Sequence, residues 1–244
     1  MTATMNLGGE AIRIDRTYMP LLLQLHGSGA VGVNDATNEA LQQLTAGRIL
    51  VDGELHPMAA AMMEIVAEPP LVLSVERLRM GSVAAATIWA NPRGAVVGSR
   101  VENQLYELKL ANADLIPFHI FQLIHLRPLP DQEPMAATIR PNDLLAAEHH
   151  VDSGEFDAAI ASLQEAGVAH AEDVVVRLQN RIASWTIHSV WGQSGTVHTG
   201  TASGIDCAAQ GHLLVEVDDE RALMTLRTAS FQDVLDTIRG TLPR

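Results

Sequence analysis

Several kinds of residue and pattern are scarce in this chain of 244 residues. Its single cysteine, Cys207, excludes a framework of internal disulfides. Basic residues number 16 against 29 acidic ones, and the formal net charge of −13 repels phosphate backbones and anionic membranes. The apolar runs YMPLLLQL and IPFHIFQLIHL are too short to span a bilayer, and MTATMNLGGE lacks the regions of a signal peptide. We expect a cytoplasmic protein that binds neither nucleic acid nor membranes.

Signatures of catalysis and of metal binding are also lacking. The ten histidines form no H-E-x-x-H pattern, and the adjacent His149 and His150 point to different sides of a helix. Cys207 in SGIDC has no family signature of a nucleophile and fits a buried apolar position better. The glycine-rich segments 27–32 and 192–195 match neither a phosphate-binding loop nor a nucleophile elbow. The sequence therefore predicts a protein that is not an enzyme and has no metal site and no cofactor.

What the chain does contain is a sequence of helical and then β patterns. In the first half, AIRIDR alternates as a short strand does, and at Leu71 four apolar or alternating runs begin, separated by Gly, Asn and Pro. Helices are predicted over 17–27, 34–47, 57–68 and 114–126, the last capped by Asp114. The Pro-rich segment RPLPDQEP is predicted to be a linker.

The second half repeats this order. Helices are predicted over 142–151 and 156–167, strands begin at Val174 with VVVRLQNRI, and Ser230 with Asp233 forms the capping box of a last helix.

Paired positions recur at a nearly constant offset between the halves. Asn34-Asp35 precedes Asn142-Asp143 by 108 residues, Gly53-Glu54 precedes Gly154-Glu155 by 101, Leu71 precedes Val174 by 103, and Trp89 precedes Trp191 by 102. This predicts an internal duplication within one domain, with pseudo-repeats at about 12–130 and 138–244. The expected fold is α+β and quasi-two-fold, with a central, mostly antiparallel sheet flanked by helical groups.

A candidate recognition site lies in TIWANPRGAVV. Trp89 is followed by a tip between two strands made of Asn91, Pro92, Arg93 and Gly94. Trp and Arg are the residue types that most often anchor interfaces, so these five residues are predicted to bind a partner. Alternatively, Trp89 and its counterpart Trp191 are core residues and the tip is an ordinary turn.

The segment LTAGRILVDGELHPMAAAMMEIVAEPPLVLSVERL, the later LIPFHIFQLIHLRPLP and the closing SFQDVLDTIRGTLP resemble the EspG family of type VII (ESX) secretion systems in actinobacteria. The resemblance covers about 12–242 and implies a cytoplasmic chaperone that holds secreted helical substrates, such as PE/PPE or WXG-like proteins, by an apolar tip. It also implies partner contacts from the loop between the second and third strands, here Asn91 to Gly94, and from the helical segment 142–167. That loop is shorter here than in the better-known mycobacterial members.

Two alternatives remain open from the sequence. A structural or regulatory protein that forms a homodimer would present a self-complementary surface. An enzyme with an unrecognised site would need a deep pocket in which a His meets a carboxylate or Cys207.

Overall fold

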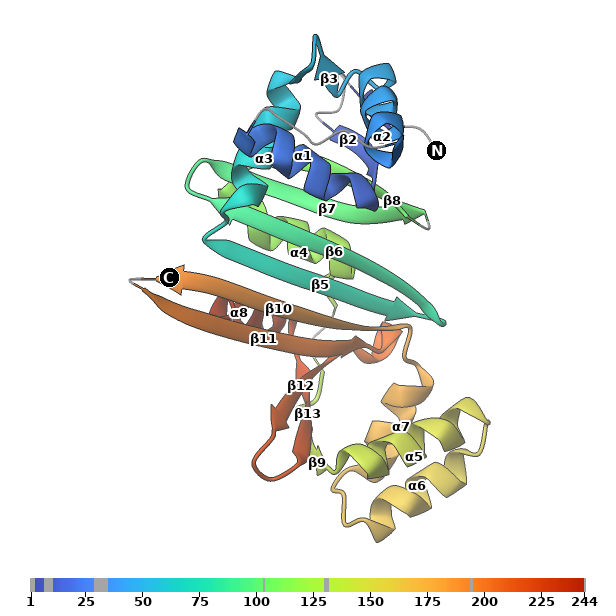
Figure 1. Ribbon diagram of the computed structural model, residues 1–244. Helices are drawn as coiled ribbons and strands as arrows, with labels where there is room; N and C mark the ends of the chain where they lie inside the picture. The colour runs from blue at the N-terminus through green and yellow to red at the C-terminus, as the bar shows by residue number, and fades with distance from the viewer. Residues whose placement is uncertain are drawn as a thin grey trace. The chain divides into compact units, whose positions relative to one another are not determined.

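The computed structural model describes residues 3–6, 11–28, 35–102, 104–129, 132–193 and 195–243. It contains a large antiparallel sheet flanked by helices, which confirms the predicted α+β class (Figure 1). Of the predicted loop at 27–32, the first two residues end a helix, Met19–Ser28, and the other four lie outside the described residues, as does residue 194 of the predicted turn GQSG. The chain divides into two compact units. The first unit consists of Met1–Ser74, Ala84–Ile120 and Ser189–Thr199. The second unit consists of Val75–Val83, Phe121–His188 and Gly200–Arg244.

The first unit carries the hydrogen-bonded strand order β1-β2-β8-β7-β6-β5. Its strands are β1 (Thr4–Asn6), β2 (Ala11–Asp15), the first part of β5 (Leu71–Arg79), most of β6 (Ser82–Asn91), β7 (Gly94–Glu102) and β8 (Leu105–Ala111), with a separate small hairpin of β3 (Leu50–Val51) and β4 (Glu54–Leu55). The end of β5, the start of β6 and the turn between them belong to the second unit. Its helices are α1 (Met19–Ser28), α2 (Asp35–Ala46), α3 (Pro57–Ala67) and the first part of α4 (Ile116–Ile124). The four strands predicted from Leu71 onward are therefore confirmed.

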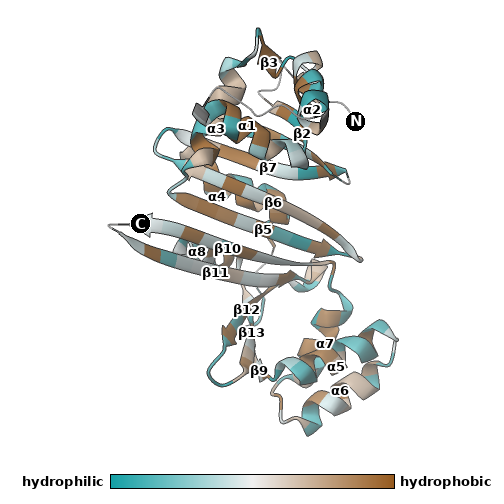
Figure 2. Ribbon diagram, in the orientation of Figure 1, coloured by the Kyte–Doolittle hydropathy of each residue, from teal (hydrophilic) through white to brown (hydrophobic). Residues whose placement is uncertain are grey.

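Helices of the first unit bury their apolar sides against its strands. Met62 and Met63 of α3, Leu22 of α1, and Ile12 and Leu108 of the strands are fully buried in one cluster. Pro57 opens α3 at a position that tolerates proline, and the His56 ring accepts a hydrogen bond from the Met58 amide. Figure 2 shows β5 changing from hydrophobic to hydrophilic along its length.

The second unit carries the strand order β10-β11-β12-β13-β9. Its strands are β9 (Ala136–Ile139), the first part of β10 (Ala183–Gln193), the last part of β11 (Thr196–Asp206), β12 (His212–Asp218) and β13 (Leu223–Ala229). Its helices are α5 (Pro141–Asp152), α6 (Phe156–Glu165), α7 (Ala171–Gln179) and α8 (Phe231–Gly240), with the end of α4. β9 was not predicted, because the Pro-rich segment before it indicated a linker. Leu144, Ala147, Leu163, Val174 and Leu178 of the three consecutive helices join one buried cluster.

Two local expectations about helix ends differ in outcome. The capping box of α8 is confirmed, since the Ser230 hydroxyl accepts from the Asp233 amide and the Asp233 carboxylate accepts from the Ser230 amide at 2.8 Å. The cap predicted at Asp114 is wrong, because Asn112 accepts the Asp114 amide at 3.0 Å and opens a 3₁₀ turn ahead of α4.

The strand predicted at Val174 is wrong, because this segment is helix α7. Three successive valines favour a strand locally, but Val174, Val175 and Leu178 lie on one helical face and are buried. Glu172 and Asp173 stand in the first turn, where negative charge favours a helix.

The pairs of positions used to infer a repeat do not occupy equivalent places. Gly53 turns between β3 and β4, whereas Gly154 turns between α5 and α6. Trp89 lies on the second of four consecutive strands of its half, and Trp191 on the first. Even so, the order strand, three helices, four strands and one helix occurs from β2 to α4 and again from β9 to α8, apart from the β3–β4 hairpin. The duplication stays a prediction.

Candidate functional site

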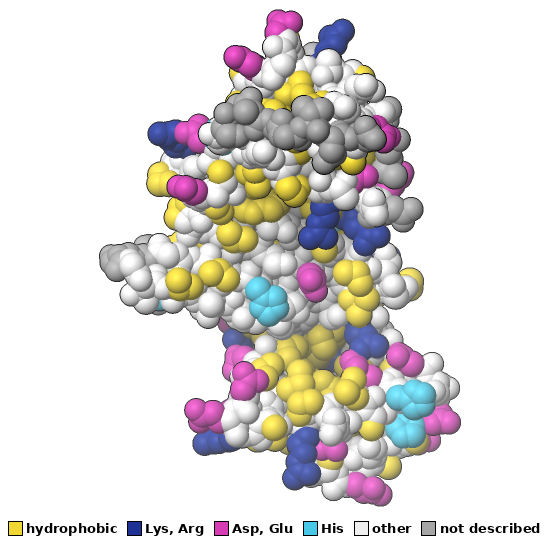
Figure 3. Space-filling model, viewed as in Figure 1, with side chains coloured by type: hydrophobic (Ala, Val, Ile, Leu, Met, Phe, Trp, Pro, Cys, Tyr) yellow, Lys and Arg dark blue, Asp and Glu magenta, His cyan; other side chains and the backbone are white. Residues whose placement is uncertain are grey.

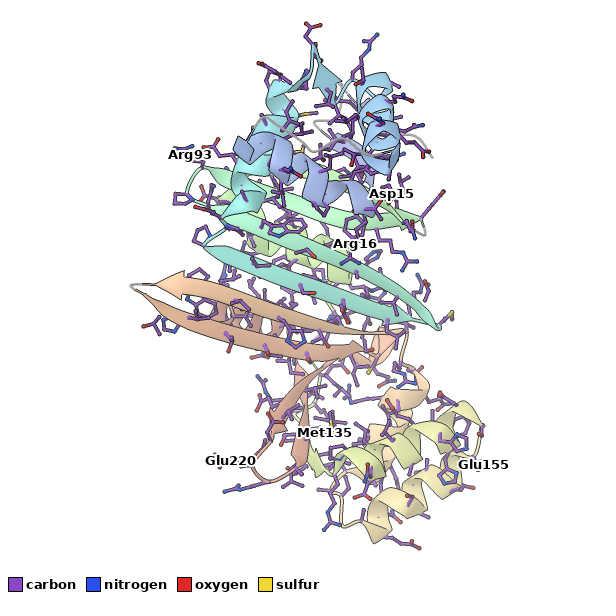
Figure 4. All side chains as sticks on the ribbon, viewed as in Figure 1. Asp15, Arg16, Arg93, Met135, Glu155 and Glu220 are labelled. Carbon is purple, nitrogen blue, oxygen red and sulfur yellow. The ribbon has the colours of Figure 1, made fainter. Side chains whose placement is uncertain are left out.

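The tip predicted from the sequence is a tight hairpin turn between β6 and β7. Asn91 pairs with Gly94 in the ladder, and the Asn91 side chain accepts the amides of Arg93 at 2.8 Å and of Gly94 at 3.2 Å. This closes the turn with local hydrogen bonds, as Asn does in many turns. Pro92 and Arg93 are exposed, and Figure 4 shows Arg93 at the end of the hairpin.

Arg93 is paired within its own unit. Its guanidinium donates to the Glu64 carboxylate of α3, and both side chains stay substantially exposed. The pair lies at a pocket of about 400 Å³ that Ile65, Leu110 and Asn112 also line. The polar groups of the tip thus already have partners inside the unit.

Trp89 is held by packing against its own sheet. It is half-buried against the first unit's core cluster, and it pairs with Val96 of β7. Its ring lies over Gly98, where an added Cβ would come within 2.7 Å of the indole. The structure therefore keeps Trp89 and the tip in one hairpin but gives the indole a packing role.

A second candidate surface is a cleft in the second unit. The turn between β5 and β6, the end of α5, the start of α6 and the segment after α7 enclose about 550 Å³. Leu78, Met80 and Phe156 form its apolar rim and are exposed by 47%, 91% and 36%. Figure 3 shows hydrophobic side chains gathered on the displayed face of this unit, with acidic and basic ones beside them. We call this site the helical cleft.

The conformation of Met80 is unusual for its residue type. Met80 has φ of 46° and Gly81 has φ of 75°, so both central residues of the two-residue turn are left-handed, as a type I′ hairpin requires. Asn or Asp is favoured at the first of these positions, and Asp52 holds the corresponding place before Gly53 with φ of 55°. A long apolar side chain in this strained, solvent-facing position adds little to the stability of the fold, which points to a role in binding.

Three charged residues stand at one end of the helical cleft. Arg181 donates to the Glu148 carboxylate, and its second terminal nitrogen lies 3.4 Å from an oxygen of Asp152. The Asp152 side chain is 66% exposed, against 27% for Arg181 and 23% for Glu148. Burial raises the pKa of Glu148 above its ordinary value, Arg181 opposes this and the charge of Asp152 adds to it.

Part of this cleft lies in a segment that the family resemblance implied as a contact region. The segment 142–167 was named as a contact region, and the structure places its residues Glu148, Asp152 and Phe156 there. The β5–β6 turn was not named as a contact, because a Met-Gly pair between two strand patterns marks the end of a strand and gives no signal of binding.

The residues considered for chemistry lack the surroundings of a reactive site. Cys207 is fully buried, and burial raises the pKa of its thiol to about 12, against the lowering effect of Arg177. Among the described residues, no three His, Cys, Asp or Glu side chains are grouped so that they could hold a metal ion. Within the same residues, every helix is too short or too polar to cross a membrane.

Comparisons with known proteins agree with the fold. The model of the EspG family matches residues 3–240. Among solved structures, the type VII secretion system chaperone EspG5 from Mycobacterium tuberculosis, in complex with a PE25–PPE41 dimer, is similar with a TM-score of 0.65 and 15% sequence identity. The match covers 96% of this chain and 97% of that one. Comparison with curated proteins gives no match.

Proposed function

Because the chain belongs to the EspG family, we propose that it is a non-catalytic cytoplasmic chaperone for helical substrates of a type VII secretion system. EspG5, whose fold it shares, was solved holding a PE–PPE dimer. By this proposal the substrate here is also a PE–PPE pair, held by an apolar tip until it is secreted.

The single observation that carries this proposal is the exposed apolar rim of the helical cleft. Leu78, Met80 and Phe156 come from two separate parts of the second unit and surround one cavity. Apolar side chains grouped at a cleft mark a surface that covers another protein. An apolar helix end laid between them would bury the rim and be shielded from water itself.

The tip at Asn91 to Gly94 is the second proposed contact, carried over from the family resemblance together with Trp89. Its polar groups are already bonded to one another and to Glu64. We expect it to contribute less to affinity than the rim of the helical cleft, because a partner would have to replace the Arg93 ion pair before using that charge.

The test is direct binding of the PE–PPE pairs encoded in the same genome, each purified and titrated calorimetrically with this protein. One pair should form a stoichiometric complex. In that complex Met80→Asn should weaken binding strongly and Arg93→Glu only slightly. If no pair binds, the chaperone proposal is wrong. If Arg93→Glu is the damaging variant, the partner sits on the tip and the cleft assignment is wrong.

The same preparation separates the two other classes of function. Light scattering that gives twice the chain mass without substrate would favour the self-associating alternative. The enzyme alternative would require an accessible Cys207, whereas its side chain is fully buried.

A further inference from the structure

The helical cleft contains more negative than positive charge. Asp152 and Glu148 share the single cation Arg181, and Glu155, in the turn that leads into Phe156, bonds to His150 at 2.8 Å. Figure 4 shows Glu155 at this α5–α6 turn. Among the residues that line the cleft, one guanidinium therefore faces two carboxylates, and Glu155 adds a further negative charge nearby, so this end of the cleft would attract a cation.

Asp152 stands at a position that the fold itself disfavours. It is the last residue of α5, where the helix dipole places negative partial charge and where cations are the stabilising side chains. Its ion pair with Arg181 spans 3.4 Å across a largely exposed site, so it offsets little of this cost. Asp152 and Met80 therefore share two properties, since each is locally unfavourable and each lines the helical cleft.

Resting on the proposed function, we infer that the segment held in the helical cleft carries a lysine or arginine that pairs with Asp152, beside the apolar residues that cover Met80 and Phe156. The occupant is thus an apolar helix end with a basic side chain at its edge. Charge complementarity of this kind selects among partners that share an apolar tip and speeds their encounter with an acidic protein. A cation arriving there would also oppose the rise in the pKa of Glu148, which is caused mainly by burial and secondarily by the charge of Asp152.

The test uses Asp152→Asn in the intact protein against the PE–PPE pair found above. Asn removes the charge, keeps the shape and suits a helix C-terminus, so the fold should be unaffected. At low salt the Kd should rise about fivefold, and the difference should shrink to less than about twofold at high salt, where the ion pair is screened. Glu165→Gln is the matched control. Glu165 is exposed on α6 and does not line the cleft, and its substitution removes one negative charge as Asp152→Asn does.

A charge reversal identifies the partner residue. Asp152→Lys should weaken binding more than Asp152→Asn, and changing one lysine or arginine of the partner's tip to Glu should restore it. If Asp152→Asn leaves the Kd unchanged or lowers it while Met80→Asn still raises it, the basic side chain is refuted and the chaperone proposal stands. If neither variant changes the Kd of a pair that binds, the cleft is not the binding site and both assignments to it fail.

Discussion

Replacing Met80 by Asn should make the protein more stable and its partner binding weaker. The left-handed conformation costs an ordinary side chain about 1–2 kcal/mol, and Asn is among the few residues that adopt it readily. The Met80 side chain is 91% exposed, so its loss removes little buried apolar surface from the free protein. We expect the free energy of unfolding to rise by about 1 kcal/mol and Tm by about 2–4 °C.

The effect on binding has the opposite sign. Burying a methionine side chain against an apolar partner contributes about 1.5–3 kcal/mol, and Asn would supply little of this. The Kd for a substrate that covers the turn should therefore rise about 10- to 150-fold. A residue with a purely structural role could not produce a gain in stability together with a loss of affinity.

Urea unfolding and calorimetric titration of the same preparations measure both quantities. Ala222 provides a matched control, since it has φ of 50° in the turn before β13, is exposed and lies outside the cleft. Ala222→Asn should raise the stability similarly and leave the Kd unchanged. The reasoning is refuted if Met80→Asn lowers the free energy of unfolding, or if it weakens binding no more than Ala222→Asn does.

Three further predictions concern the fold. Gly204→Ala should lower the free energy of unfolding by about 1–3 kcal/mol in urea titration, since its Cβ would come within 2.4 Å of the Trp185 ring; an unchanged midpoint would contradict this. Cys207, with its thiol pKa raised to about 12, should resist an aromatic disulfide reagent at pH 8 until the protein unfolds, so rapid labelling of the native protein would show that it is accessible. Hydrogen bonds from Ser230 lower the pKa of Asp233 in the folded protein. The ionised Asp233 therefore stabilises the fold fully at a pH above its pKa in the unfolded chain, and this contribution is lost as the pH falls through its pKa in the folded protein. Thermal melts should accordingly show a smaller loss between neutral and acid pH in Asp233→Asn, and an equal loss would contradict the assignment.

The parts of the fold that could be predicted are those in which local chemistry and packing agree. The capping box of Ser230 and Asp233 fixes the start of α8 from neighbouring residues alone. The strands after Leu71 were predictable because Gly, Asn and Pro separate their apolar runs. Helix α7 was not predictable in this way. Burial of Val174 and Leu178 in the second unit's core outweighs the β propensity of the valines, and burial depends on contacts with residues distant in the sequence.

The candidate site shows the same division. The segment 142–167 was expected to contact a partner only because the resemblance to the EspG family implies it, and its own residues carry no pattern that indicates binding. Met80 could not be named as a contact from the sequence. The case for it depends on a φ angle of 46° and on its 91% exposure. The sequence predicts neither value, because the first residue of this turn is not Asn, Asp or Gly. Conversely, Trp89 and Arg93 stood out because their residue types are common at interfaces, yet the structure packs Trp89 against its own sheet and pairs Arg93 with Glu64.

This contrast is the strongest reason to place the partner at the helical cleft. At the tip, Asn91 closes its own turn and Arg93 neutralises Glu64, so every local rule is obeyed and the free protein already gains from the contacts. At the cleft, Met80 holds a strained backbone position and Asp152 opposes its helix dipole. A sequence under selection for stability alone would have replaced both, because each has a better alternative that fits without rearrangement. Their presence on one cavity is explained if a bound substrate provides the compensating contacts, apolar for Met80 and basic for Asp152.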